Sequence, residues 1–136
     1  MPMSTFKLLL AAVAFSFSTF ASAEIGDTNV IDAIATKPDS QIATLLLFQA
    51  RSWDAGVLDL LAKKVEFYRL SVTSGKLVEK RSDLADKKIR FVIVYAEQPS
   101  DAALEALQKD QRELADDHIE LFWSGKQGLS SVIAHP

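Results

Sequence analysis

Ile89-Arg-Phe-Val-Ile-Val-Tyr95 is an almost unbroken apolar run of strand length, rich in β-branched and aromatic residues. Such a run is typical of a strand that is buried on both faces of a sheet. Ile42-Ala-Thr-Leu-Leu-Leu-Phe48 has the same character. Each run is soon followed by side chains that favour a helix start, Ser52 or Asp54 after the earlier run and Ser100 after the later one. This repeated order of strand and helix predicts an α/β fold.

The rest of the chain supplies further elements around these two strands. Apolar residues at helical spacing predict a helix after each cap. Aromatic and β-branched runs between turn residues predict strands. The elements expected are a helical turn at 30–34, helices over 52–64 and 99–116, a short helix near 82–85, and strands over 65–72, 119–123 and 129–134.

These elements predict one small domain with a mixed, mostly parallel sheet of four to five strands and helices packed on it. A thioredoxin-like arrangement is favoured. The alternative is a ferredoxin-like split β-α-β, in which residues 73–88 form an elongated hairpin. The chain divides into a signal peptide over 1–23, an N-terminal extension over 24–40 and the single α/β domain over 41–136.

The second half of the domain resembles a known family. Arg90-Phe-Val-Ile-Val-Tyr95, then Ser100-Asp101, then Leu107, Gln111 and Leu114, are similar to the opening of a thioredoxin-like domain family of unknown function. That family occurs in secreted bacterial proteins and in sushi-repeat extracellular proteins. Gly125-Lys126-Gln127-Gly128 is similar to a turn near the family's end. The resemblance covers about residues 88–128; it implies a thioredoxin-like fold and no catalytic residue.

The first 23 residues have the pattern of a cleavable secretory signal. Lys7 precedes an apolar run from Leu8 to Phe20, and Ala21-Ser22-Ala23 provides the small residues that signal peptidase recognises. The apolar run is shorter than the roughly 20 residues that span a membrane. We therefore expect cleavage between Ala23 and Glu24, a periplasmic or secreted mature protein, and no stable membrane span after cleavage.

The composition excludes several classes of function. The chain has no cysteine, so dithiol redox chemistry, thiolate nucleophiles and cysteine-ligated zinc are ruled out. It is acidic, with 18 Asp and Glu against 15 Lys and Arg. The basic residues are dispersed, whereas binding to nucleic acid needs them clustered. We expect no nucleic-acid partner and no cofactor.

Two loops are the candidate site. In open α/β sheets, ligands bind beyond the carboxyl ends of the strands, near helix N-termini. The loops in that position contribute Arg51, Trp53 and Asp54, and Glu97 and Asp101. Arg51 is suited to hold a carboxylate or phosphate, and Trp53 to stack on a ligand or partner. The competing interpretation is structural: the serines and aspartates cap the helices, and Trp53 covers the edge of the core.

Other polar groups carry weaker signals. His118 follows Asp116 and Asp117, but adjacent side chains at a helix end point in different directions, so we expect no metal site. The chain also has no Gly-x-Ser-x-Gly elbow of the kind that serves an α/β-hydrolase.

Two functional hypotheses remain. The leading one is an exported, non-catalytic and redox-inactive binding or interaction domain, whose partner is another envelope protein or a small ligand. The alternative is a small hydrolase or ligand-processing enzyme with its site at the 49–54 and 97–101 loops.

Overall fold

Four strands form one mixed sheet in the computed structural model, which describes residues 25, 26 and 28–128. The strands are β2 (Ala33–Ala35), β3 (Ile42–Gln49), β4 (Lys88–Tyr95) and β5 (Glu120–Gly125), and they lie in that order across the sheet. β2 pairs antiparallel with β3, whereas the β3–β4 and β4–β5 pairs are parallel. The prediction of a mixed, mostly parallel sheet in an α/β domain is confirmed.

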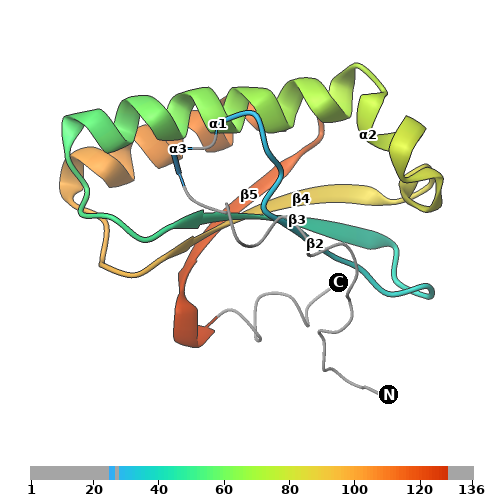
Figure 1. The fold of residues 1–136 in the computed structure, drawn as a ribbon, viewed down its shortest axis with the longest axis horizontal. Helices are drawn as coiled ribbons and strands as arrows, with labels where there is room; N and C mark the ends of the chain where they lie inside the picture. The colour runs from blue at the N-terminus through green and yellow to red at the C-terminus, as the bar shows by residue number, and fades with distance from the viewer. Residues whose placement is uncertain (1–24, 27, 129–136) are drawn as a thin grey trace.

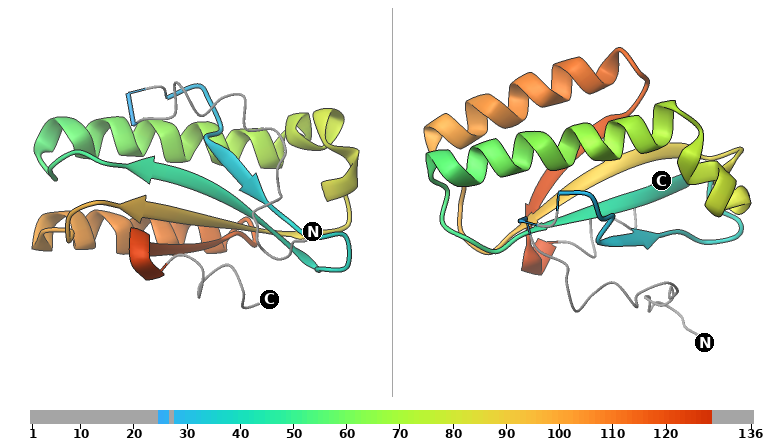
Figure 2. Two further views of the ribbon diagram at one scale, coloured as in Figure 1. Left: turned by 60° about the horizontal axis from the view of Figure 1, so that its bottom comes forward. Right: turned by 45° about the horizontal axis from the view of Figure 1, so that its top comes forward.

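Two long helices lie on one face of this sheet (Figures 1 and 2). α1 (Ala55–Thr73) connects β3 to β4 through the short α2 (Lys76–Lys80) and the 3-10 turn η2 (Ser82–Leu84). α3 (Asp101–Ala115) connects β4 to β5, and the 3-10 turn η3 (Lys126–Gly128) follows β5. Parallel strands are connected by right-handed crossovers in nearly all proteins. Both crossovers here advance in the same direction across the sheet, so this rule places both helices on the same face.

The prediction of a strand over 65–72 is wrong, because these residues form the second half of α1. The buried positions of α1 recur every three or four residues along its whole length: Val57, Leu61, Lys64, Val65, Tyr68 and Ser71. This stripe faces the sheet, and burial of the stripe outweighs the modest strand preference of Phe67 and Tyr68. The lysine within the stripe concealed its helical period.

The prediction of a helical turn at 30–34 is also wrong. Residues 33–35 form β2, in which Ala33 pairs with Leu46 and Ala35 with Thr44. A three-residue strand gives too little alternation to be recognised in a sequence. The antiparallel edge strand expected at 129–134 lies outside the described residues.

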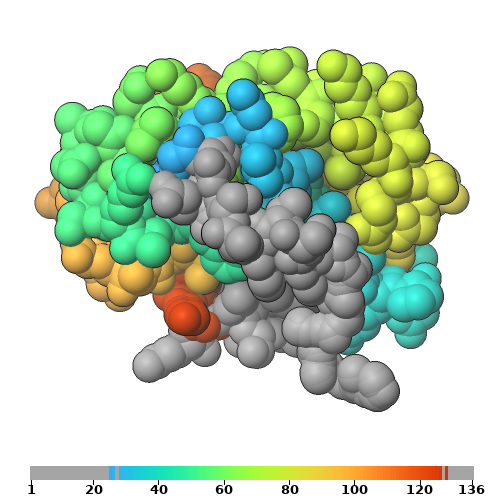
Figure 3. Space-filling view, viewed as in Figure 1, coloured from blue at the N-terminus to red at the C-terminus, as the bar shows by residue number. Residues whose placement is uncertain are grey.

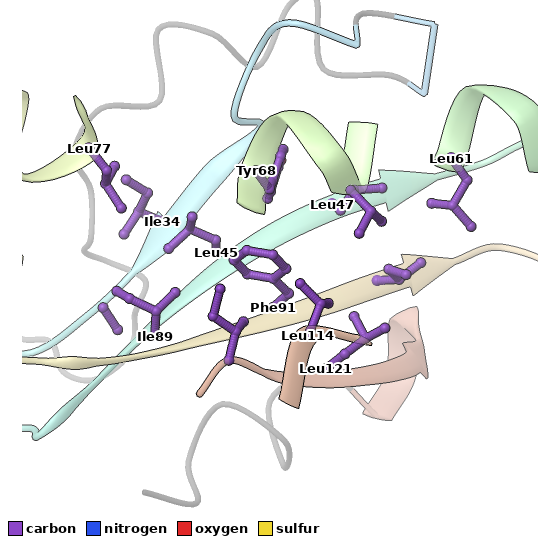
Figure 4. Close-up of a cluster of buried hydrophobic side chains, with 14 of the residues drawn as sticks. Ile34, Leu45, Leu47, Leu61, Tyr68, Leu77, Ile89, Phe91, Leu114 and Leu121 are labelled. Atoms are coloured by element: carbon purple, nitrogen blue, oxygen red, sulfur yellow. The ribbon is translucent and has the colours of Figure 1, made fainter. Parts of the chain in front are cut away.

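The main core lies between the helices and the sheet (Figure 4). β3 contributes Leu45 and Leu47, and β4 contributes Phe91, all of them completely buried. The ring of Phe91 meets Tyr68 of α1 edge-on, with ring centroids 5.5 Å apart. The alternate residues of the same strands, Leu46, Val92 and Val94, are buried on the opposite face. Burial on both faces explains why the strands are continuous apolar runs.

The end of α3 gives a first prediction. His118 adopts φ 61°, the left-handed conformation that favours glycine, and its N–H donates to the Ala115 carbonyl at 3.0 Å. We expect His118→Gly to raise the free energy of unfolding by about 0.5–1 kcal/mol, because glycine adopts this conformation without a steric penalty. Urea unfolding measures the change. His118→Ala is the control, since alanine keeps the strain; an equal gain from both variants would contradict the explanation.

Candidate functional site

The structure brings the two predicted loops together. Gln49 and Tyr95, the last residues of β3 and β4, are register partners, and the chain leaves both strands at the same edge of the sheet. The Ala96 N–H donates to the Gln49 carbonyl at 3.2 Å and extends the pairing by one residue. The loops over 49–54 and 97–101 therefore start side by side, each leading to a helix N-terminus.

Trp53 and Glu97 link these loops directly. The Trp53 Nε1–H donates to the Glu97 backbone carbonyl at 2.7 Å, and the indole meets the ring of Tyr95 edge-on at 6.5 Å between centroids. The Ser52 hydroxyl lies 3.5 Å from a Glu97 carboxylate oxygen. Trp53 is half-buried and packs against the main core. It therefore covers the edge of the core, as the structural interpretation expected, and also fixes one loop to the other.

Arg51 lies on a backbone that a buried side chain holds in place. Gln49 is 1% exposed; its Nε2 donates to the Arg51 carbonyl at 2.7 Å, and its Oε1 accepts the Arg51 N–H at 2.9 Å. This pair of bonds closes a tight turn, so Arg51 is exposed on a loop of fixed shape. Sequence reasoning placed Gln49 in the loop but assigned it no role. The available signal was a long polar side chain at the end of an apolar strand.

Asp54 has the structural role that its position suggested. Its Oδ1 accepts the Val57 N–H at 2.8 Å and caps α1, while the Ser100 hydroxyl accepts the Ala103 N–H at 3.2 Å and caps α3. Asp101 lies exposed in the first turn of α3, where a carboxylate is favourable to the helix dipole. Of the predicted residues, Trp53 and Glu97 are in contact, whereas Arg51, Asp54 and Asp101 lie elsewhere on the two loops and at the start of α3.

Sequence reasoning missed a buried polar cluster on the helix-covered side. Lys64 Nζ lies 2.6 Å from Asp32 Oδ1, and both side chains are 0% exposed. The other oxygen of Asp32 accepts the Phe48 N–H at 2.8 Å. The Asp32 N–H donates to the Tyr68 hydroxyl at 2.8 Å, and that hydroxyl donates to the Leu46 carbonyl at 2.6 Å. Burial, and next the nearby Asp32 charge, raise the pKa of Tyr68 well above its usual value, so Tyr68 stays a neutral donor.

His118 lies at the opposite end of the sheet from the loops. It borders an open hollow of about 560 Å³, which is lined by Lys88, Gln111, Ala115, His118, Ile119, Glu120, Leu121 and Phe122. The Gln111 amide donates to the Leu121 carbonyl there at 2.8 Å. Asp117 pairs with Arg69 of α1 at 3.1 Å, which ties α1 to the end of α3. In the part of the chain that the structure describes, no cluster of three His, Asp or Glu residues could hold a metal.

The partly buried carboxyl group of Asp110 should make the stability of the protein depend on pH. Burial, and next repulsion from Glu113, raise its pKa from 3.8 to about 6. The folded state therefore binds more protons than the unfolded state between pH 4 and 6, and stability falls as the pH rises through that range. We expect Asp110→Asn to raise the free energy of unfolding at pH 7 by about 1 kcal/mol, a value reduced for the partial exposure of the group. The gain should vanish near pH 4.

Urea unfolding of both proteins across pH 4–7 measures this effect. Glu105→Gln, an exposed carboxylate of the same helix, is the control and should give no such pH-dependent gain. A gain for Asp110→Asn that is equal at pH 4 and pH 7 would contradict the assignment.

Comparison with known proteins adds one finding. The profile of a family of unknown function (DUF6572) matches residues 23–127, which is most of the chain. No curated protein and no solved structure matches. This family is not the thioredoxin-like one expected from residues 88–128, and the comparisons give no sign of that family. Among the helices of the described residues, none has the length and apolar character needed to cross a membrane.

Proposed function

Since the chain belongs to this family of unknown function (DUF6572), we propose its role from the geometry. The protein is an exported interaction domain that is non-catalytic and redox-inactive. It contacts another envelope protein or a small ligand through the edge formed by the 49–54 and 97–101 loops. The signal pattern before Glu24 supports export to the periplasm or beyond, and the lack of cysteine supports the absence of thiol redox chemistry.

The observation that carries the proposal is the bond between Trp53 Nε1 and the Glu97 carbonyl, at 2.7 Å. This bond joins two loops that are 44 residues apart in sequence, at the edge where open α/β sheets hold their ligands. The buried Gln49 side chain fixes the 49–54 loop through its two hydrogen bonds to the Arg51 backbone. A surface that is fixed before binding loses less conformational entropy when a partner binds.

The polar groups of this edge favour recognition over chemistry. The Asp54 carboxylate is already engaged as a helix cap. Arg51, Glu97 and Asp101 are exposed and present charges of both signs on the two loops that Trp53 joins. Charged side chains around an aromatic group are a common composition for a protein contact surface.

The test is co-purification with tagged protein of residues 24–136 from an envelope fraction. We expect a partner that the unmodified protein retains and that Arg51→Ala or Trp53→Ala loses by about tenfold or more. Lys80→Ala, an exposed change on α2, is the control and should retain the partner. Circular dichroism verifies that each variant is folded. Equal retention by all four proteins would contradict the choice of this edge.

The alternative is a small hydrolase or ligand-processing enzyme at the same loops. One contact favours it: the Ser52 hydroxyl lies 3.5 Å from the Glu97 carboxylate. A carboxylate beside a hydroxyl is part of a nucleophile site, although activation also requires a general base in reach. A turnover that is lost in Ser52→Ala and in Glu97→Gln, with the fold retained, would replace the interaction proposal by this one.

The assignment of the fold to a thioredoxin-like or a ferredoxin-like class is also a proposal. The thioredoxin-like resemblance of residues 88–128 corresponds to β4, α3 and β5, a strand, helix and strand in the expected order. The ferredoxin-like alternative needed an extended hairpin over 73–88, and α2 and η2 lie in that stretch. The thioredoxin-like proposal is therefore the better supported of the two.

A further inference from the structure

The sheet face that points away from α1 and α3 is apolar and buried. Ala33, Leu46, Val92 and Val94 form a hydrophobic cluster there, and their exposed fractions lie between 0% and 7%. We call the surface formed by these four residues the second face. In the part of the chain that the structure describes, no helix or strand lies over it (Figures 1 and 2). A valine on a bare sheet face keeps contact with water, so the complete burial of Val92 requires a cover.

A charged side chain on the same side of the sheet is shielded as well. Arg90 precedes Val92 by two residues in β4 and therefore points to the same side. It is 5% exposed, and its Nε and Nη2 donate to the Thr44 hydroxyl at 3.2 and 3.1 Å. Shielding thus extends from Arg90 to Val94, a distance of about 13 Å along the strand. A cover of this length corresponds to a short stretch of chain.

The last described residues of the chain approach the second face. Ser124 is the register partner of Val94, so its side chain lies on that side of the sheet. Gly128 lies against it, since a Cβ on Gly128 would be only 2.8 Å from Ser124 Oγ. In Figure 1 and the right view of Figure 2, the red η3 lies on the side of the sheet away from both long helices. Residues 129–136 therefore follow from a point beside the second face.

The first described residues lie on the helix side instead. Ile25 is 1% exposed and belongs to the main cluster between the helices and the sheet. Asp32 is joined to α1 through Lys64 at 2.6 Å. In Figure 3 the blue atoms that precede β2 lie against the green atoms of α1. Of the two ends of the described chain, only Gly128 is thus placed to continue onto the second face.

The sequence after Gly128 suits this position. It reads Leu129-Ser-Ser-Val-Ile-Ala-His-Pro136, with apolar side chains at Leu129, Val132 and Ile133. Eight extended residues reach about 26 Å, whereas four strands are about 14 Å across. We propose that residues 129–134 pack across the second face and cover it with these apolar side chains. The second face is then an internal docking surface, occupied by the chain's own segment and distinct from the loop edge of the proposed function.

The test uses thiol reactivity, because the chain has no cysteine of its own. Val92→Cys places a thiol on the second face, and Ile93→Cys places one on the helix side; both positions are 0% exposed. A soluble disulfide reagent modifies a thiol only when it can reach it. In the full chain we expect slow modification at both positions. Removal of residues 129–136 should raise the rate at position 92 at least about tenfold and leave the rate at position 93 unchanged.

A second pair of variants keeps the test valid if the shortened chain does not fold. In the full chain, Val132→Asp with Ile133→Asp should raise the rate at position 92 in the same way, because charged side chains do not pack on an apolar face. Ser130→Asp with Ser131→Asp is the matched control; it adds the same charge to the same segment and should leave the rate low. Circular dichroism verifies that each variant is folded.

Four results would overturn the inference. Slow modification at position 92 after removal of residues 129–136 would mean that the segment lies elsewhere, for example along β5. Equal acceleration at positions 92 and 93 would indicate a general loosening of the domain. Acceleration at position 92 on removal of residues 1–23 instead would make the N-terminal segment the cover. Protection at position 92 that depends on protein concentration would make a second copy of the chain the cover.

Discussion

Lys64→Met is expected to lower the free energy of unfolding by about 3–5 kcal/mol. The Lys64 ammonium lies 2.6 Å from Asp32 Oδ1, and both side chains are completely shielded from solvent. Methionine fills nearly the same volume but removes the positive charge. The Asp32 carboxylate then stays buried and loses the positive charge that lay 2.6 Å from it, and this loss of a close partner accounts for most of the destabilisation. Because whole domains of this size are stable by only about 5–15 kcal/mol, the variant should be close to unfolding.

Urea unfolding followed by circular dichroism measures this loss, with Lys63→Met as the matched control. Lys63 is the preceding residue of α1, is 63% exposed, and pairs with Asp59 at 3.3 Å on the solvent side. Exposed helix pairs contribute about 0.3–0.5 kcal/mol, so the control should differ little from the unmodified protein. The double variant Asp32→Asn, Lys64→Met should recover part of the loss, because it removes both charges of the buried pair. Equal midpoints for Lys63→Met and Lys64→Met would show that the buried pair is unimportant.

The strands β3 and β4 could be predicted from the sequence, because strands that are buried on both faces consist almost entirely of apolar residues. β3 and β4 are covered on both faces, which selects continuous apolar residues whatever the distant partners are. The caps Asp54 and Ser100 could be predicted for a similar reason, since a helix N-terminus needs a side-chain acceptor within a few residues.

The errors occurred where a distant partner decides the structure. Lys64 interrupts the apolar stripe of α1 and makes the helix appear to end there. Its position in the core depends on Asp32, which lies 32 residues earlier. β2 likewise exists because β3 offers an unpaired edge to three residues that have no strong preference of their own. No local pattern contains this information.

The candidate site was predictable in part for the same physical reasons. The rule that ligands bind at the carboxyl ends of parallel strands depends only on topology, and it located the two loops that the structure brings together. The hydrogen bond from Trp53 to the Glu97 carbonyl could not be predicted from the sequence, because every residue has a backbone carbonyl and the residue type does not show which one accepts. The hydrogen bonds from the Gln49 side chain to the Arg51 backbone could not be predicted, because glutamine is seldom buried at the end of a strand.

Phe91→Ala is expected to lower the free energy of unfolding by about 3–5 kcal/mol. Phe91 lies in β4, an inner strand of the sheet, and is completely buried beneath the helices. Its ring contacts Tyr68 edge-on at 5.5 Å between centroids, so it supports the residue whose hydroxyl joins Asp32 to the Leu46 carbonyl. Alanine at this position leaves a cavity enclosed by a sheet and two helices, and such surroundings can collapse only partly.

Phe122→Ala is the control for this prediction, because it removes the same ring from the neighbouring strand β5. Phe122 is 39% exposed, and its ring lies 5.9 Å from the Arg90 guanidinium, so we expect a loss of about 1 kcal/mol or less. The two variants together separate the loss of a buried ring from the loss of an aromatic residue in a strand. A similar loss for both would mean that the packing of α1 on β4 is not what stabilises the domain. A much larger loss for Phe91→Ala, together with amide exchange that rises more at Asp32 than at the buried amides of α3, would show that the core holds the N-terminal segment in place through Tyr68.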